Sequence, residues 1–230
     1  MTISLNQKLG SASNNATGIS SVARILSVAV SAGDTIIIGG GYGGGSTVTI
    51  TATDSRNNTY QVDRQDDLTT GATPHSFVLS AAVTTPLQIS DTITVSFSSP
   101  VNYPCFSAYD YSGLPSSSWV DTSGGATGLA GTALSTGNIT TARTNDLLFA
   151  SAYYGNSSSP TFTAGSGYTA LDTILLIPKD ATTESGTSTT AGTYAATATL
   201  SQANDWAISV VAYGAAAARQ PSLMMMGVGS

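Results

Sequence analysis

The sequence predicts an all-β protein, folded as a two-layer antiparallel β-sandwich of jelly-roll-like form and built from two pseudo-repeats. The first observation is the repeat itself. Asp34 opens the apolar run 35–38, and Asp146 opens the run 147–149, at a separation of 146 − 34 = 112 residues. The pairs Tyr42-Gly43 and Tyr154-Gly155 lie at the same separation. A duplicated unit that cannot bury its apolar face alone finds its partner in the other copy, which favours one domain with two layers.

Composition supplies two further observations. Only 9% of the residues are charged, and Thr, Ser, Asn and Gly provide most of the polarity. This composition suits strands, because Thr is β-branched and its hydroxyl stays solvated on a sheet surface. No part of the sequence shows the sustained apolar period of about 3.6 residues that is typical of a helix. We therefore expect very little helix.

Strand-like runs follow one another along both repeats. Residues 47–51 alternate polar and apolar side chains, which is the pattern of a half-buried strand, and the Asp- and Asn-rich run 54–58 behind them predicts a turn. The strands predicted in the first repeat are residues 22–30, 35–38, 47–53, 60–62, 75–81, 93–97 and 105–111. Those predicted in the second repeat are residues 132–140, 146–152, 161–164, 169–176, 193–200 and 206–213.

The domain boundaries follow from changes in composition. Residues 1–20 have no apolar period, which predicts an extended N-terminal arm before a single sandwich domain at residues 21–214. Gly, Pro and Ser residues within 112–131 predict a bridge between repeats at 22–111 and 132–213. Residues 215–230 form an apolar, Met-rich C-terminal arm, which docks on a partner, packs on its own domain or frays. Met is favoured at adaptable contact surfaces, so we predict partner docking by Leu223, Met224, Met225 and Met226.

Charge and cysteine content exclude several functions. The net charge is −6, and phosphate backbones bind clustered cations, so no nucleic-acid partner is expected. The single cysteine, Cys105, excludes an internal disulfide and is predicted to be a small buried hydrophobe rather than a reactive thiol. No segment has the apolar length of a signal peptide or a membrane span. We expect a soluble product, without a membrane partner, that would leave a cell by another route such as a virus particle.

Motifs for catalysis are incomplete. The glycine-rich run 39–45 contains G-x-G-x-x-G, but a predicted strand follows where a dinucleotide site needs a helix, so the run is predicted to be a flexible loop. His75 is the only histidine and no G-x-S-x-G is present, which favours a surface residue over the base of a serine hydrolase. We expect no enzymatic activity, no cofactor and no transition-metal site.

Carboxylates cluster in one segment. Asp63, Asp66 and Asp67 supply oxygen atoms of the kind that bind calcium, although the segment lacks the alternation and the closing Glu of an EF-hand loop. A charged turn is the favoured interpretation, and calcium binding stays open. Glu184 is the only glutamate, and nothing in the sequence indicates a carboxylate pair of the kind that glycosidases use.

Aromatic residues near predicted loops offer a binding function. Tyr42, Trp119, Tyr153 and Tyr154 are candidates for stacking on a sugar ring, since aromatic side chains present a large apolar face with a polar edge. Trp119 is the strongest candidate for an exposed ring because it lies in the predicted bridge. Trp206 begins the last predicted strand and is assigned to the core.

Two stretches carry a resemblance to a known kind of module. Residues 33–38 with 49–60, and residues 161–168 with 192–200, resemble the two halves of a β-sandwich module of tailed-phage structural proteins, such as decoration and fibre proteins, and of bacterial surface proteins. The resemblance covers residues 22–214 and rests on strands and turns. It implies a binding or structural role rather than catalysis.

These observations together favour a non-enzymatic virion structural protein, a capsid decoration (cement) or head-fibre protein of a tailed bacteriophage. Such a protein would bind the capsid or another virion protein through its terminal arms. It would also form a homo-oligomer of closed symmetry, for which we expect a trimer. The alternative is a carbohydrate-binding or adhesive module on a phage or bacterial surface, which would bind a cell-surface glycan through the four aromatic residues named above.

Overall fold

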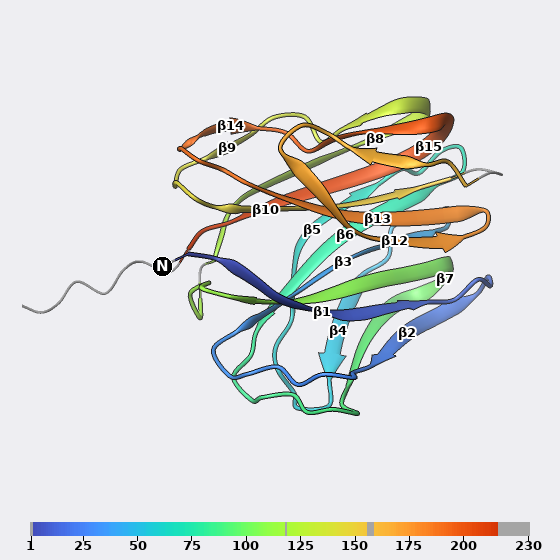
Figure 1. The fold of residues 1–230 in the computed structure, drawn as a ribbon. Helices are drawn as coiled ribbons and strands as arrows, with labels where there is room; N and C mark the ends of the chain where they lie inside the picture. Colours follow the sequence, from blue (N-terminus) through green and yellow to red (C-terminus); the bar gives the residue numbers. More distant parts are fainter. Residues whose placement is uncertain (1, 118, 156–158, 216–230) are drawn as a thin grey trace, which may run out of the picture.

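The computed structural model describes residues 2–117, 119–155 and 159–215, and its regular elements are all strands (Figure 1). Two antiparallel sheets, one from each half of the chain, pack against each other. In Figure 1 the sheet of the second half lies above that of the first. The predicted fold class, an all-β two-layer sandwich, is confirmed. Within the described residues, no helix is long and apolar enough to cross a membrane.

The first sheet has its central strands in the order β1-β7-β3-β6-β5. β2 and β4 pair with the first part of β7, so β7 serves both the central sheet and a small outer layer. The strands are β1 (Ser4–Ser13), β2 (Ile19–Ile25), β3 (Thr35–Gly43), β4 (Ile50–Asp54), β5 (Gln61–Asp67), β6 (Pro74–Ala82) and β7 (Thr92–Ser112).

The second sheet repeats this order as β8-β15-β10-β13-β12. β11 pairs with β15 as β4 pairs with β7, and β9 and β14 form a separate two-stranded ladder. The strands are β8 (Val120–Ser135), β9 (Ile139–Thr141), β10 (Leu147–Tyr154), β11 (Phe162–Ala164), β12 (Tyr168–Leu176), β13 (Lys179–Thr187), β14 (Gly192–Tyr194) and β15 (Thr197–Tyr213).

The halves share details of register as well as strand order. A register shift interrupts β5 between Val62 and Arg64, and another interrupts β12 between Ala170 and Asp172. A bulge adds one residue to one strand of a pair and is a specific local feature. Its presence at the same place in both halves supports a duplication, and it fixes which residues of the two halves correspond.

Two segments predicted to lie outside the repeats are strands. The predicted N-terminal arm, residues 1–20, contains β1 and the start of β2, and β1 pairs with β7 along its length. The predicted bridge, residues 112–131, contains most of β8, which pairs with β15. Both are edge strands with many small or polar residues, because an edge strand that faces solvent needs few apolar side chains. The two units therefore extend to residues 4–112 and 120–213.

The strands β3 and β10 form the centre of the interface between the sheets, and both are buried along their whole length. Ile37 and Phe149 belong to one apolar cluster between the sheets, together with tyrosines of β7 and β15. The glycine-rich run is part of β3, so the prediction of a flexible loop is wrong for residues 39–43. A Cβ atom added to Gly41 would overlap the Tyr153 side chain. Glycine there lets the two sheets approach closely.

Each sheet also has an apolar core on its outer face. Leu79 and Ile93 belong to the core of the first half, which β2 and β4 cover. Leu148 and Ile208 belong to the corresponding core of the second half. The two central sheets are thus packed on both faces, which explains why their middle strands read as continuous apolar runs.

Candidate functional site

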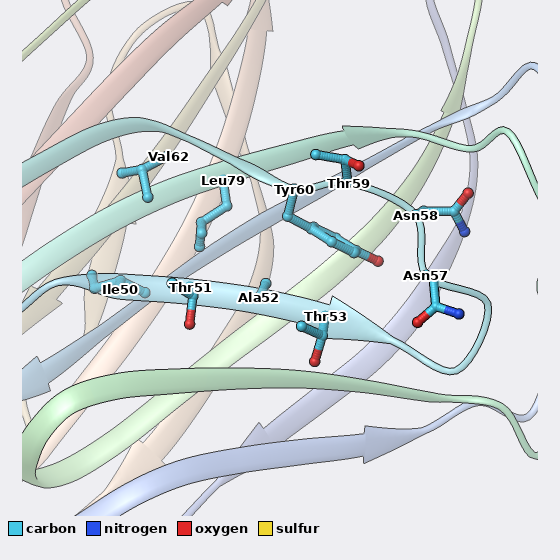
Figure 2. A pocket seen from close by; sticks show the side chains of 10 residues that line it. All are labelled: Ile50, Thr51, Ala52, Thr53, Asn57, Asn58, Thr59, Tyr60, Val62 and Leu79. Atoms are coloured by element: carbon cyan, nitrogen blue, oxygen red, sulfur yellow. The ribbon is translucent and has the colours of Figure 1, made fainter.

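A groove lies between β4 and β5 in the first half (Figure 2). It has a volume of about 420 Å³. The half-buried Ala52 and Tyr60 contribute apolar surface, and Ile50 and Leu79, which belong to the core, border the groove. The remaining lining residues are Thr51, Thr53, Asn57, Asn58, Thr59 and Val62. None of the ten lining side chains is charged.

A hydrogen-bonded loop holds Tyr60 in place. Asp54, at the end of β4, accepts hydrogen bonds from the backbone N–H of Arg56 and of Asn58 and from the Tyr60 hydroxyl, the last at 3.0 Å. The Asn58 side chain donates to Asp54 and accepts from the backbone N–H of Thr84. These bonds fix the loop before any ligand arrives, which lowers the entropy cost of binding.

Tyr60 was not among the predicted site residues, although the repeat contains a signal for it. Gln61 pairs with Ser80 in the first half, and Thr169 pairs with Ser185 in the second, so Tyr60 and Tyr168 occupy equivalent positions. A comparison of the two repeats residue by residue would have identified this pair of tyrosines. The groove itself depends on the distance between β4 and β5, which the sequence pattern does not give.

The four residues predicted to stack on sugars are inside the protein. Tyr42, Tyr153 and Tyr154 are 0% exposed, and Trp119 is 8% exposed. Their faces pack against other side chains, so they present no platform to a sugar ring in this conformation, and the prediction of exposed rings is corrected. Trp119 follows a turn-rich segment, but its indole lies between the two sheets.

His75 is fully buried, so the prediction of a surface residue is wrong. Its Nδ1 lies 2.7 Å from Asp67 Oδ1, and its Nε2 lies 2.6 Å from the carbonyl oxygen of Gly44. The ring stacks on Tyr42 with 4.3 Å between the ring centroids. Both ring nitrogens therefore lie within hydrogen-bonding distance of oxygen atoms inside the fold.

The three carboxylates of residues 63–67 point to different partners. Tyr213 donates to Asp63, Ser209 and Arg64 donate to Asp66, and His75 binds Asp67. Burial raises the pKa of Asp67, but hydrogen bonds from His75 and Gln65 outweigh this effect, and the pKa lies below its ordinary value. Among the described residues, no group of three or more His, Cys, Asp or Glu side chains is placed to hold a metal ion.

The second half contains a buried acidic side chain that sequence reasoning did not assign to the core. Glu184 of β13 is 1% exposed, and neither of its carboxylate oxygens has a hydrogen-bond partner within the described part of the chain. Burial raises the pKa of Glu184 to about 8. Its register position corresponds to that of Leu79 in the first half, because the paired strands β3 and β10 align at a separation of 112 residues.

The predicted burial of Cys105 is confirmed, and burial raises the pKa of its thiol. The residues predicted to dock on a partner, Leu223, Met224, Met225 and Met226, lie outside the described residues. No protein-family model, curated protein or solved structure matches this chain.

Proposed function

We propose that this chain is a non-enzymatic structural protein of a virus particle, a capsid decoration or head-fibre protein of a tailed bacteriophage. The observation that carries the proposal is the placement of the groups capable of chemistry. His75, Asp66 and Asp67 are bound by neighbouring groups within the fold. The exposed surface is mainly neutral, because only 9% of the sequence is charged. The sequence resemblance to phage structural modules supports the same role.

Attachment to the shell falls to the C-terminal arm in this proposal, because the N-terminal residues belong to β1 and β2. The arm would bind a capsid or other virion protein, or neighbouring copies in a homo-oligomer, for which a trimer is proposed. Light scattering on the full chain and on a chain that ends at Tyr213 tests this. An oligomer that becomes monomeric on truncation supports the assembly role of the arm.

Electron microscopy of particles that lack this chain tests the virion role directly. Loss of a surface feature, restored when the purified protein is added back, supports the proposal. Particles with unchanged surface features would show that the chain is not a decoration or fibre protein. The same particles bound by the full chain but not by the truncated chain would assign attachment to residues 214–230.

A second candidate function is sugar binding in the groove between β4 and β5. The specific observation is Tyr60, held by Asp54 beside threonine hydroxyls and asparagine amides, in a groove without charged side chains. This lining suits a neutral sugar, which offers an apolar face and many hydroxyl groups. In this alternative, a sugar would bind in the groove and not on the four buried aromatic residues.

A glycan array with matched variants tests this second candidate. Val62 is 44% exposed at the groove, so Val62→Arg would fill the groove without disturbing the core. Its counterpart Ala170 is exposed at the same position of β12, so Ala170→Arg is the control. Glycan signals that Val62→Arg removes and Ala170→Arg preserves would support the groove. An array without signal for the unmodified chain would contradict it.

A further inference from the structure

The two ends of the interface between the sheets are built from equivalent strands, because β5 contacts β8 at one end and β12 contacts β1, less extensively, at the other. The strands β8 and β1 begin in matching register. Val120 pairs with Tyr213, and Leu5 pairs with Tyr111. The preceding residues differ, because Trp119 precedes Val120 whereas Ser4 precedes Leu5. The two ends of the interface can therefore be compared residue by residue.

At the first end, Trp119 fills the space between the sheets. Its indole Nε1 donates a hydrogen bond to Ser80 Oγ at 2.7 Å. The neighbouring Tyr213 is fully buried, and its hydroxyl donates to Asp63 Oδ2 at 2.5 Å. The Trp119 indole N–H and the Tyr213 hydroxyl therefore both have hydrogen-bond acceptors inside the protein.

At the second end, the corresponding space is a pocket of about 360 Å³, where β1 contacts β12. Its lining residues in the first half are Ile3, Leu5 and Tyr111, and those in the second half are Leu147, Gly167, Thr169, Ser185, Gly186 and Thr187. Ser185 is the counterpart of the serine that binds Trp119, because the strand pairs β6-β3 and β13-β10 have the same register. Ser4 has no ring to fill this pocket.

The two ends also differ in how a buried tyrosine is held. Tyr111 is 2% exposed, and its hydroxyl lies beside the Ser185 side chain. Its counterpart Tyr213 donates to Asp63, but Leu171 occupies the equivalent bulge position of β12. Ser185 is therefore the polar group that the Tyr111 hydroxyl can use, and a serine oxygen can accept a second hydrogen bond. Ser185 Oγ remains an acceptor for a ring that enters the pocket.

We propose that this pocket binds an aromatic ring that carries an N–H donor, the chemistry of a tryptophan side chain. The ring N–H donates to Ser185 Oγ, as Trp119 donates to Ser80 Oγ. The ring comes from a free tryptophan-like molecule or from a side chain of a partner protein. The site does not depend on the virion role proposed above.

Titration of the full chain with N-acetyl-L-tryptophanamide, followed by protein NMR shifts and by saturation transfer to the probe, tests the site. We expect shifts confined to β1, β12, β13 and the end of β7. The ring of N-acetyl-L-phenylalaninamide has no N–H and would leave Ser185 without its donor, so this probe should bind roughly tenfold more weakly. A peptide with one central tryptophan is the second arm. Tighter binding of the peptide assigns the ring to a partner chain.

Two variants and a matched control decide whether the pocket is the site. Ser4 is exposed at the start of β1, so Ser4→Trp is compatible with folding and should fill the pocket with the ring of the chain itself. Ser4→Trp and Ser185→Ala should each weaken probe binding by about tenfold or more. Ser80→Ala, at the equivalent position of the other end, should leave it unchanged. No response to either probe, or binding that both pocket variants preserve, overturns the proposal.

Discussion

Replacement of Glu184 by leucine should stabilise the protein at alkaline pH, and the structure gives the size of the effect. The carboxylate of Glu184 lies in the outer core of the second half, 1% exposed and without a hydrogen-bond partner among the described residues. The first half has Leu79 at the equivalent position, inside its apolar core. Glu184→Leu therefore introduces the residue that the other copy of the fold already uses.

The magnitude follows from the pKa of Glu184, which burial raises from an ordinary value of 4.5 to about 8. Each pKa unit between the folded and unfolded states corresponds to about 1.4 kcal/mol, so the ionised side chain costs up to about 5 kcal/mol above pH 8. Between pH 4.5 and 8 the folded protein binds more protons than the unfolded protein, so stability falls as pH rises. Below this window the carboxyl group is protonated and neutral in both states, so it no longer makes stability depend on pH.

Urea unfolding over a pH series that spans this window measures the effect, with the unmodified chain, Glu184→Leu and Glu184→Gln compared at each pH. Burial and the neighbouring Asp121 raise the pKa of Asp146 to about 6, so the unmodified chain has a second source of pH dependence. The difference between the chains is therefore the quantity of interest. It should grow from pH 5 to pH 8 for both variants. Parallel curves for all three chains would refute the reasoning.

Three further substitutions test the interior of the protein by urea or thermal unfolding. His75→Leu removes the ring contacts to Asp67 and to the carbonyl of Gly44, while Asp67 keeps its hydrogen bonds from Gln65 and Tyr42, so a loss of about 1–3 kcal/mol is expected; an unchanged urea midpoint would contradict this. Trp119→Phe keeps a ring but leaves Ser80 Oγ without its donor, and a loss of about 1–3 kcal/mol is expected from the urea midpoint. Gly41→Ala should lower the melting temperature because its methyl group overlaps Tyr153, whereas Gly45→Ala, where a Cβ meets no atom within 4 Å, should not; equal effects would contradict the proposed role of Gly41 in sheet packing.

Much of the fold was predictable because buried positions of a strand carry apolar residues, and the sequence shows where these residues lie. The run 35–38 reads as apolar because both faces of β3 are covered, and the 112-residue repeat identified β10 as its counterpart. The edge strands β1 and β8 were missed for the opposite reason. The polar residues of β1 mostly face solvent, and glycines of β8 lie against larger side chains such as Trp206 and Asp66. The place of both strands in the sheets depends on backbone hydrogen bonds that any sequence can form.

The site residues were less predictable than the strands, because local sequence does not show which way a ring points. Trp119 lies beside a serine-rich turn, yet its indole crosses between the sheets to reach Ser80. His75 stands at the start of β6, yet it is enclosed by Tyr42 and Asp67, which come from other strands. The groove at Tyr60 arises from the spacing of two strands. Each of these features depends on contacts between distant segments.

The two halves differ in their outer cores, and this has a consequence for stability. Where the first half places Phe77 and Leu79, the second places Thr182 and Glu184. The second half therefore buries less apolar surface at these positions on its outer face. The interface between the sheets is common to both halves and includes Phe149 and Val211 of the second. Since a half with a poorer core depends more on this interface, the two halves should unfold in one transition, and a variant that separates the sheets, such as Gly41→Ala, should destabilise both together.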